Sequence, residues 1–159
     1  MEYVSGQIWT PHGFQEGHIG FKDGVIEEVG RGRAKGNIAE GIILPTLINA
    51  HTHIIDYVVP VDMGMSLAEV VAPPHGLKYR KLAQTSPLKQ RKTASYLSEY
   101  MLRKGISSFS DFREGSVEGV GILSSAKGAR PFIMGKTREP RFDRDEVHEL
   151  LNVADGIGP

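Results

Sequence analysis

One stretch of the sequence decides the fold that we predict, and it reads Ile42-Ile43-Leu44-Pro45-Thr46-Leu47-Ile48-Asn49-Ala50-His51-Thr52-His53. Its apolar residues run almost without interruption around Pro45, which is typical of a strand buried on both faces in a parallel sheet. The strand ends in His51-Thr52-His53. Because successive side chains alternate across a strand, His51 and His53 project to one side while Thr52 points away.

From this stretch toward the C-terminus, strands and helices alternate. We predict helices that begin near Ser86 and Asp143, because both residues can cap a helix, and a further helix over residues 117–127. The strands that we expect after the first one are Ile106–Phe112, Pro131–Met134 and one beginning at Asp155. Residues 54–85 read as an irregular, proline-containing loop. This alternation predicts an α/β fold with parallel strands and right-handed crossovers.

The alternation amounts to three βα units and the start of a fourth. A (β/α)₈ barrel typically needs about 250 residues, and fewer than half of that number follow residue 41. We therefore expect a partial barrel over residues 44–159, which is either a half barrel or is completed elsewhere.

Residues 1–43 form a separate pattern of short strands broken by turns. Lys22-Asp23-Gly24 is a strong signal for a hairpin, so we predict a small antiparallel β domain over this range. His12 and His18 lie in it, and we expect both to be exposed to solvent.

The composition excludes several classes of protein. Lys plus Arg and Asp plus Glu both total 19 in the 159 residues, which gives no reason to expect a nucleic-acid partner or an acidic membrane surface. The chain has no cysteine, so any metal must be held by histidines and carboxylates. We find neither a signal peptide nor an apolar run of about 18 residues, and the default prediction is a soluble cytoplasmic protein without a membrane partner.

Two imidazoles on one side of a strand can bind a single cation. Zinc takes histidine nitrogens at roughly 2.0–2.1 Å, and active sites lie at the C-terminal ends of strands in barrels and open α/β sheets. The same two side chains could also merely line a polar surface. The residues by themselves leave both interpretations open.

The stretch from Ile42 to His53 resembles the "PG-x-(I/V)-(N/D)-x-H-x-H" signature of the metal-dependent amidohydrolase superfamily. Gly24–Gly30 also resembles that family, and Gly105–Gly115 is similar to the second barrel strand of its cytosine-deaminase-like or chlorohydrolase-like branch. Thr46 departs from the pattern, which usually has glycine there to shape the turn. Members of this family pair a small β-sandwich with a (β/α)₈ barrel. The resemblance therefore implies that residues 1–43 are a segment of the sandwich.

The resemblance also implies a site and a reaction. His51 and His53 are the counterparts of the first two ligands of a catalytic divalent metal, for which we expect zinc. Further histidine ligands and the aspartate that acts as general base follow later strands, and we expect them beyond residue 159. Metal-activated water would attack a C–N bond of a small cyclic amide or would deaminate an amino-substituted ring. Since catalytic zinc usually has three protein ligands, we predict that the 159 residues alone bind metal poorly and do not turn over substrate.

Asp56 and Arg113 are weaker candidates for contacts with substrate. Asp56 follows His53 closely and could touch substrate or remain a solvated carboxylate. Arg113 could grip a carboxylate of the substrate, but it shares one face of its strand with Asp111, so an internal ion pair is the commoner explanation.

The sequence also allows a second interpretation, in which the chain has no catalytic function of its own. The chain could be a non-catalytic fragment, or a subunit that a second polypeptide or another copy completes. An unclosed barrel exposes sheet edges and apolar interior surface, which favours association.

Overall fold

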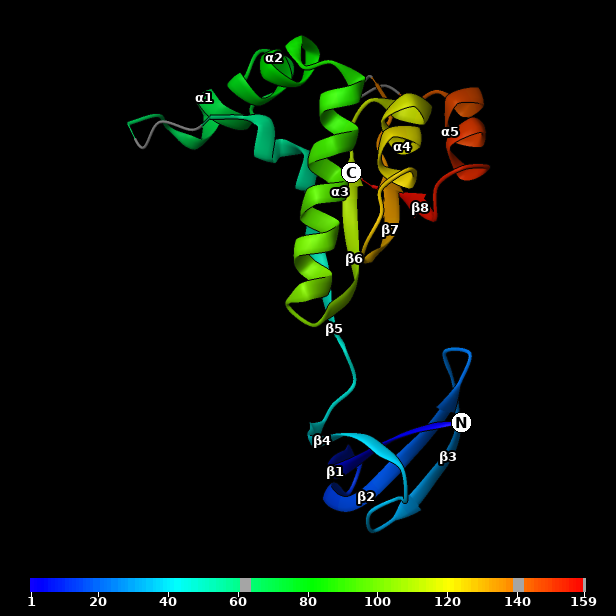
Figure 1. The fold of residues 1–159 in the computed structure, drawn as a ribbon. Coiled ribbons are helices and arrows are strands. Elements are labelled where there is room, and N and C mark those ends of the chain that lie inside the picture. The colour runs from blue at the N-terminus through cyan, green and yellow to red at the C-terminus, as the bar shows by residue number, and fades with distance from the viewer. Residues whose placement is uncertain (61–63, 139–141, 159) are drawn as a thin grey trace. The chain divides into compact units, whose positions relative to one another are not determined.

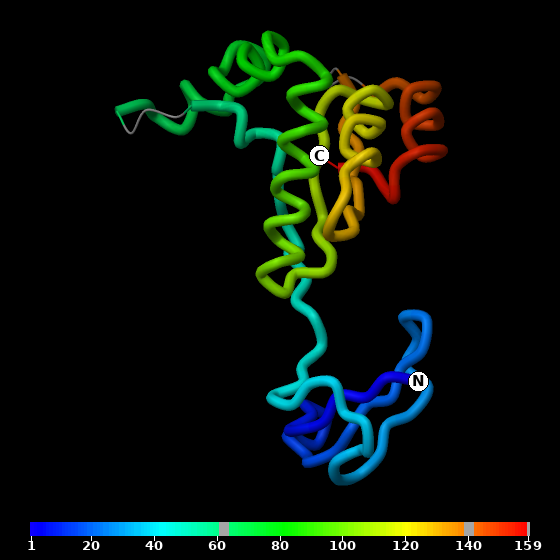
Figure 2. The backbone as a smooth tube through the Cα atoms, viewed as in Figure 1, coloured from blue at the N-terminus to red at the C-terminus, as the bar shows by residue number. Residues whose placement is uncertain are grey.

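The computed structural model describes residues 1–60, 64–138 and 142–158 (Figure 1). The chain forms two compact units, residues 1–46 and 47–159, and Figure 2 traces the backbone through both. The domain boundary that we predict after residue 43 stays a prediction, because compactness does not show that either unit folds alone.

The first unit is one four-stranded sheet in the order β3-β2-β1-β4. Its strands are β1 (Glu2–Thr10), β2 (Gly13–Lys22), β3 (Val25–Arg31) and β4 (Asn37–Ile43). The predicted hairpin is present between β2 and β3, where Asp23 and Gly24 both have positive φ, as a tight two-residue hairpin turn requires.

The prediction of a wholly antiparallel segment is wrong at β4, which pairs with β1 in parallel. The chain leaves β3 at one edge of the sheet and returns at the opposite edge beside β1. A strand that is added after such a crossing can run parallel to its neighbour, whereas a hairpin forces the antiparallel direction. The unit is therefore a mixed sheet, and the sandwich remains part of the proposal below.

The second unit is an α/β structure, as predicted, with all four strands parallel in the order β5-β6-β7-β8. Its elements along the chain are β5 (Leu47–Thr52), the 3-10 helix η1 (Ile54–Val58), α1 (Leu67–Val71), α2 (Leu77–Gln84), α3 (Pro87–Arg103), β6 (Ile106–Arg113), α4 (Ser116–Ser124), β7 (Arg130–Gly135), α5 (Arg144–Leu151) and β8 (Gly156–Ile157). The prediction that residues 54–85 are irregular is wrong for the described part of that range, where η1, α1 and α2 lie, while residues 61–63 are outside the described residues.

Local signals place the ends of the longer helices. The Ser86 hydroxyl accepts a hydrogen bond from the backbone N–H of Lys89 at the start of α3. The Asp143 carboxylate accepts from the N–H groups of Asp145 and Glu146 at the start of α5. Both caps were predicted, whereas α4 ends at Ser124, three residues before the predicted end. Within the described part of the chain, no helix has the length and apolarity that crossing a membrane requires.

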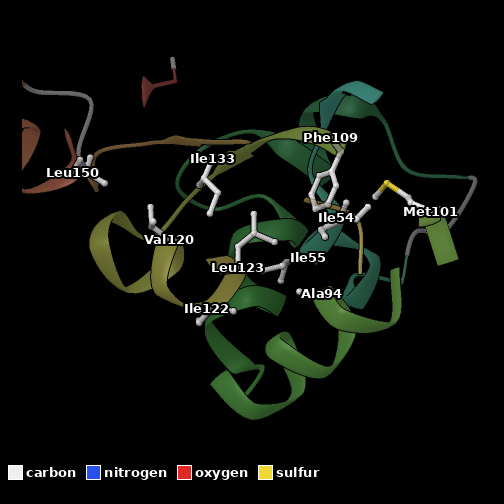
Figure 3. Close-up of a cluster of buried hydrophobic side chains, with 11 residues drawn as sticks. Ile54, Ile55, Ala94, Met101, Phe109, Val120, Ile122, Leu123, Ile133 and Leu150 are labelled. Carbon is white, nitrogen blue, oxygen red and sulfur yellow. The ribbon is translucent and has the colours of Figure 1, made fainter. Parts of the chain in front are cut away.

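The hydrophobic core of the second unit lies between the helices and the strands β6 and β7 (Figure 3). Phe109 and Ile133 reach it from these strands, and α3 and α4 cover it with Ala94 and Leu123, among others. Ile55 of η1 is also fully buried there. The core therefore anchors the segment that directly follows the two histidines.

The first strand is not buried on both faces, which corrects our prediction. Leu47 and Ile48 of β5 are 63% and 67% exposed. The physical reason is that β5 forms the edge of the sheet, where it pairs with β6 on one side, while the core packs under β6 and β7.

Candidate metal-binding site

The two histidines of the first strand converge at its C-terminal end. His51 lies on β5 and His53 follows directly, at the start of η1. Their Nε2 atoms are 3.3 Å apart. The His51 ring stacks on the Phe112 ring, with centroids 4.4 Å apart. The rings thus share one side, as the alternation of side chains predicts, and His51 is exposed to solvent.

A backbone carbonyl fixes the proton on His53. Its Nδ1 atom lies 3.0 Å from the carbonyl oxygen of Phe112 at the end of β6. A carbonyl oxygen can only accept, so Nδ1 carries the hydrogen and donates it. In the neutral ring, Nε2 then carries a lone pair on the side that faces Nε2 of His51, 3.3 Å away. This is how metal-binding histidines are commonly oriented in proteins.

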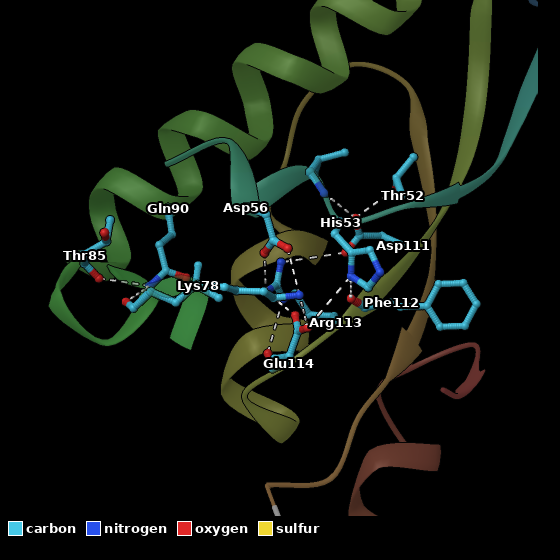
Figure 4. Close-up of polar contacts among 12 residues, drawn as sticks. Thr52, His53, Asp56, Lys78, Thr85, Gln90, Asp111, Phe112, Arg113 and Glu114 are labelled. Atoms are coloured by element: carbon cyan, nitrogen blue, oxygen red, sulfur yellow. Dashed lines mark hydrogen bonds and ion pairs between the residues drawn. The ribbon is translucent and has the colours of Figure 1, made fainter. Parts of the chain in front are cut away.

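Asp111 of β6 contacts the residues on both sides of His53 (Figure 4). Its Oδ2 atom accepts hydrogen bonds from the Thr52 hydroxyl at 2.9 Å and from the Ile54 N–H at 2.7 Å. Burial raises the pKa of the Asp111 carboxyl, although the Ile54 N–H and Arg113 act in the opposite direction. The ion pair that we predict between Asp111 and Arg113 is present, with Oδ1 and Nη1 3.8 Å apart.

Beside the histidines lies a set of four charged residues, Asp56, Lys78, Arg113 and Glu114, which we call the charge cluster (Figure 4). Lys78 Nζ is 2.7 Å from Asp56 Oδ2 and also contacts Glu114 Oε1. Arg113 Nη2 donates to Glu114 Oε2 at 2.7 Å and lies 4.0 Å from Asp56 Oδ1.

The charge cluster is largely buried, since Lys78 is 6% and Arg113 2% exposed. Burial acts to raise the pKa of Glu114, but the charge of Arg113 and the contact with Lys78 outweigh it, so that the pKa is lowered. Burial acts to lower the pKa of Lys78, but hydrogen bonds to Asp56 and Glu114 outweigh it, so that the pKa is raised. Both shifts favour the charged forms.

The structure places the two candidates for substrate contacts inside this cluster. Asp56 is partly exposed and paired with Lys78. Arg113 is buried, and its guanidinium is occupied by Glu114 and Asp111. A direct grip on substrate by Arg113 would require these contacts to open, and the roles of both residues stay predictions.

Lys78 is the member of the cluster that sequence reasoning missed. Its local context, Gly76-Leu77-Lys78, follows two prolines at the start of a helix and carries no chemical signal. Glu114, in contrast, adjoins Arg113 at the end of a predicted strand, where its position in the sequence already places it near the site.

The histidine pair fits two coordination positions of zinc. Two nitrogens bound at roughly 2.0–2.1 Å to one tetrahedral zinc lie about 3.3 Å apart, which is the separation between the two Nε2 atoms. Among the residues that the structure describes, no group of three or more His, Cys, Asp or Glu side chains could hold a metal. Within the described residues, the candidate site therefore consists of the histidine pair alone.

A groove of about 720 Å³ lies nearby, lined by residues of α2, α3 and α4. It reaches Arg113 and Glu114 at one end, but neither histidine lines it. The groove therefore contacts the charge cluster and not the candidate metal ligands.

In sequence, the chain is 34% identical, over an alignment of 173 positions, to a "Putative aminohydrolase" of Methanothermobacter thermautotrophicus. The alignment covers 98% of this chain and 44% of the relative. A second protein of that name, from Archaeoglobus fulgidus, is 30% identical over 131 residues, covering 82% of this chain and 38% of the relative. The chain thus spans less than half the length of these relatives. No family model matches it.

Solved structures of low sequence identity share the fold. E. coli guanine deaminase superimposes with a TM-score of 0.65 at 16% identity, covering 96% of this chain and 43% of the deaminase. Atrazine chlorohydrolase from Arthrobacter aurescens, complexed with zinc, gives 0.61 at 16% identity, covering 96% and 41%. The resemblance that we predict to the amidohydrolase superfamily is confirmed, and the chain spans less than half the length of each of these proteins.

Proposed function

We propose that this chain is the N-terminal portion of a metal-dependent hydrolase that acts on C–N bonds other than peptide bonds, with zinc held by His51 and His53. The observation that carries the proposal is the 3.3 Å separation of their Nε2 atoms at the end of a parallel strand. The names of the archaeal relatives support an aminohydrolase. The partial barrel and the sandwich segment belong to the same proposal.

When bound, zinc would lower the pKa of a coordinated water toward 7 and polarise the bond that is cleaved. The residues of this chain orient the ligands. The Phe112 carbonyl accepts a hydrogen bond from Nδ1 of His53, and Asp111 accepts from the Thr52 hydroxyl and the Ile54 N–H on either side of that residue. We place the remaining ligands and the aspartate that acts as general base beyond residue 159.

We propose a small cyclic amide or an amino-substituted ring as the substrate. The names guanine deaminase and atrazine chlorohydrolase, borne by two proteins of the same fold, support a ring. Asp56 and Arg113 remain our candidates for contacts with it, Asp56 being the more accessible of the two. We propose no nucleic-acid or membrane partner.

A second candidate follows from the exposed edge of the sheet. Leu47 and Ile48 leave apolar surface uncovered on β5, next to the histidines, and such an edge favours pairing with further strands. This supports a non-catalytic fragment or a subunit that a second polypeptide or another copy completes. Size-exclusion chromatography of the chain tests it: a concentration-independent monomer contradicts completion by another copy.

Zinc titration by calorimetry tests the metal site. We expect weak zinc binding with a 1:1 stoichiometry. The affinity for zinc should fall at least about tenfold in His51→Ala and in His53→Ala, because each variant removes one of the two proposed ligands. His12→Ala, which removes an exposed histidine from the other unit, serves as the control and should bind zinc as the wild type does. Binding that is insensitive to His51→Ala would refute the proposed site, and tight binding would refute its incompleteness.

A further inference from the structure

We propose that Lys78 is a positioning residue for the histidine pair, holding the His53 ring in place through Asp56 and Glu114. The inference rests on the proposed role of His51 and His53 as metal ligands, and it adds a residue that acts through others.

The burial and the partners of Lys78 are the first observation. Lysine is almost never fully buried unless it is paired, and this one is 6% exposed. Its ammonium contacts two carboxylates, Asp56 of η1 and Glu114, which follows β6 directly. Lys78 itself lies on α2. One charged group thus joins three segments that meet beside the histidines (Figure 4).

Both partners of Lys78 touch His53, at different points. The backbone N–H of Asp56 donates to the His53 carbonyl at 2.9 Å. Glu114 Oε1, the same atom that contacts Lys78, lies 3.8 Å from Nδ1 of the His53 ring. The two routes from Lys78 therefore reach the backbone and the side chain of one candidate ligand.

Without Lys78, a competing acceptor becomes available to the His53 ring. Glu114 Oε2 is held by Arg113, whereas Oε1 has Lys78 as its close partner. Once Oε1 is released, the nearby Nδ1–H of His53 becomes an available donor, and a charged acceptor competes well with a carbonyl. The ring would turn from the Phe112 carbonyl toward Glu114, and Nε2 would move away from His51. Lys78 prevents this by occupying Oε1.

Histidine ring signals in metal-free NMR spectra of the full chain test this role. In Lys78→Met we expect the ring signals of His53, assigned with His53→Ala, to shift, while those of His12 stay in place. The control is Arg80→Met, which removes a positive charge from an exposed side chain on the same helix and should leave the His53 signals unchanged. Lys78→Met/Glu114→Gln removes the competing carboxylate as well, and should bring the His53 signals back toward those of the wild type.

A residue that only anchors α2 would give a different result. The amide signals of α2 would change in Lys78→Met while the His53 ring signals stay within their linewidth, and that outcome overturns the proposal. A shift of equal size in Arg80→Met also overturns it. If Lys78→Met does not fold, as judged by circular dichroism, Lys78→Gln provides the same test with a polar side chain in place.

Zinc titration of the same variants separates this inference from the proposed function. We expect an affinity loss of about tenfold in Lys78→Met, the size typical of outer-shell partners, and none in Arg80→Met. If the wild type binds no zinc while the His53 signals still shift, the proposed function fails and the positioning role stands. If the wild type binds zinc and the His53 signals do not shift, the inference alone fails.

Discussion

Asp111→Ala should be less stable than Asp111→Asn by about 1–3 kcal/mol, because only asparagine retains an acceptor for the Ile54 N–H. The carboxylate is fully buried, and its Oδ2 atom accepts from Ile54 N–H and from the Thr52 hydroxyl. The Thr52 hydroxyl also lies 2.9 Å from the Ser110 carbonyl oxygen, which can accept from it. Loss of the hydrogen bond from Thr52 to Asp111 therefore matters less. The Ile54 N–H donates to Asp111 Oδ2 at 2.7 Å, and this hydrogen bond carries most of the difference.

Both variants remove the free-energy cost of burying an ionised carboxylate, which is why we compare them with each other. Urea unfolding followed by circular dichroism at 222 nm is the assay, since every described helix lies in the unit of residues 47–159. Equal midpoints at unchanged slopes would contradict the reasoning, since the hydrogen bond to Ile54 would then contribute nothing.

The pKa of Asp111 gives a second prediction, which compares Asp111→Asn with the wild type. Burial raises the pKa of this carboxyl, so its protonated form is favoured by folding. The stabilisation is present below the unfolded pKa of about 3.9 and is lost as pH rises through the folded pKa. Asp111→Asn, which stays neutral, should therefore gain stability relative to the wild type as the pH rises through that range. A difference that is constant with pH would contradict this.

The remaining predictions concern the first unit, whose unfolding the single tryptophan reports. Gly6→Ala should lower the free energy of unfolding by at least about 2 kcal/mol. Gly6 has a φ of +143°, and a Cβ there would lie 1.8 Å from the Gly41 carbonyl oxygen. Gly41→Ala serves as the control, because a Cβ at Gly41 would meet nothing within 4 Å. The Gly32 carbonyl and Glu28 raise the pKa of His18, so folding favours the protonated ring. The stability that this ring adds to the folded state is present below about pH 6.5 and is lost as the pH rises through the folded pKa. His18→Gln should abolish this dependence in urea titrations at several pH values.

Features that depend on a few neighbouring residues were predictable from the sequence. The caps at Ser86 and Asp143 are local, because each side-chain oxygen accepts hydrogen bonds from N–H groups that lie within three residues of it. The convergence of His51 and His53 is equally local, because two residues on one strand share a face whatever the strand packs against.

Burial was harder to predict, because it depends on what lies opposite. The apolar run before His51 indicates a strand with two covered faces, yet Leu47 and Ile48 are exposed at an edge. His18 shows the opposite error. We expected it to be exposed, but its side chain is largely buried, with Gly32 and Glu28 as hydrogen-bond partners from the neighbouring strand and turn. Apolarity indicates that a residue can be buried, but the arrangement of the strands decides which residues are.

The register of β5 against β6 explains why the surroundings of the histidines escaped prediction. Thr52 is paired with Asp111, and this pairing brings the Phe112 carbonyl and Glu114 to His53. A slip of one residue would turn the other face of β6 toward the site and would leave His53 with different partners. Nothing in the local sequence fixes that register, and nothing local predicts that α2 delivers a lysine to the same point. The histidine pair can be found from its spacing and the family resemblance suggests its role, but the residues that surround the pair depend on contacts between distant segments.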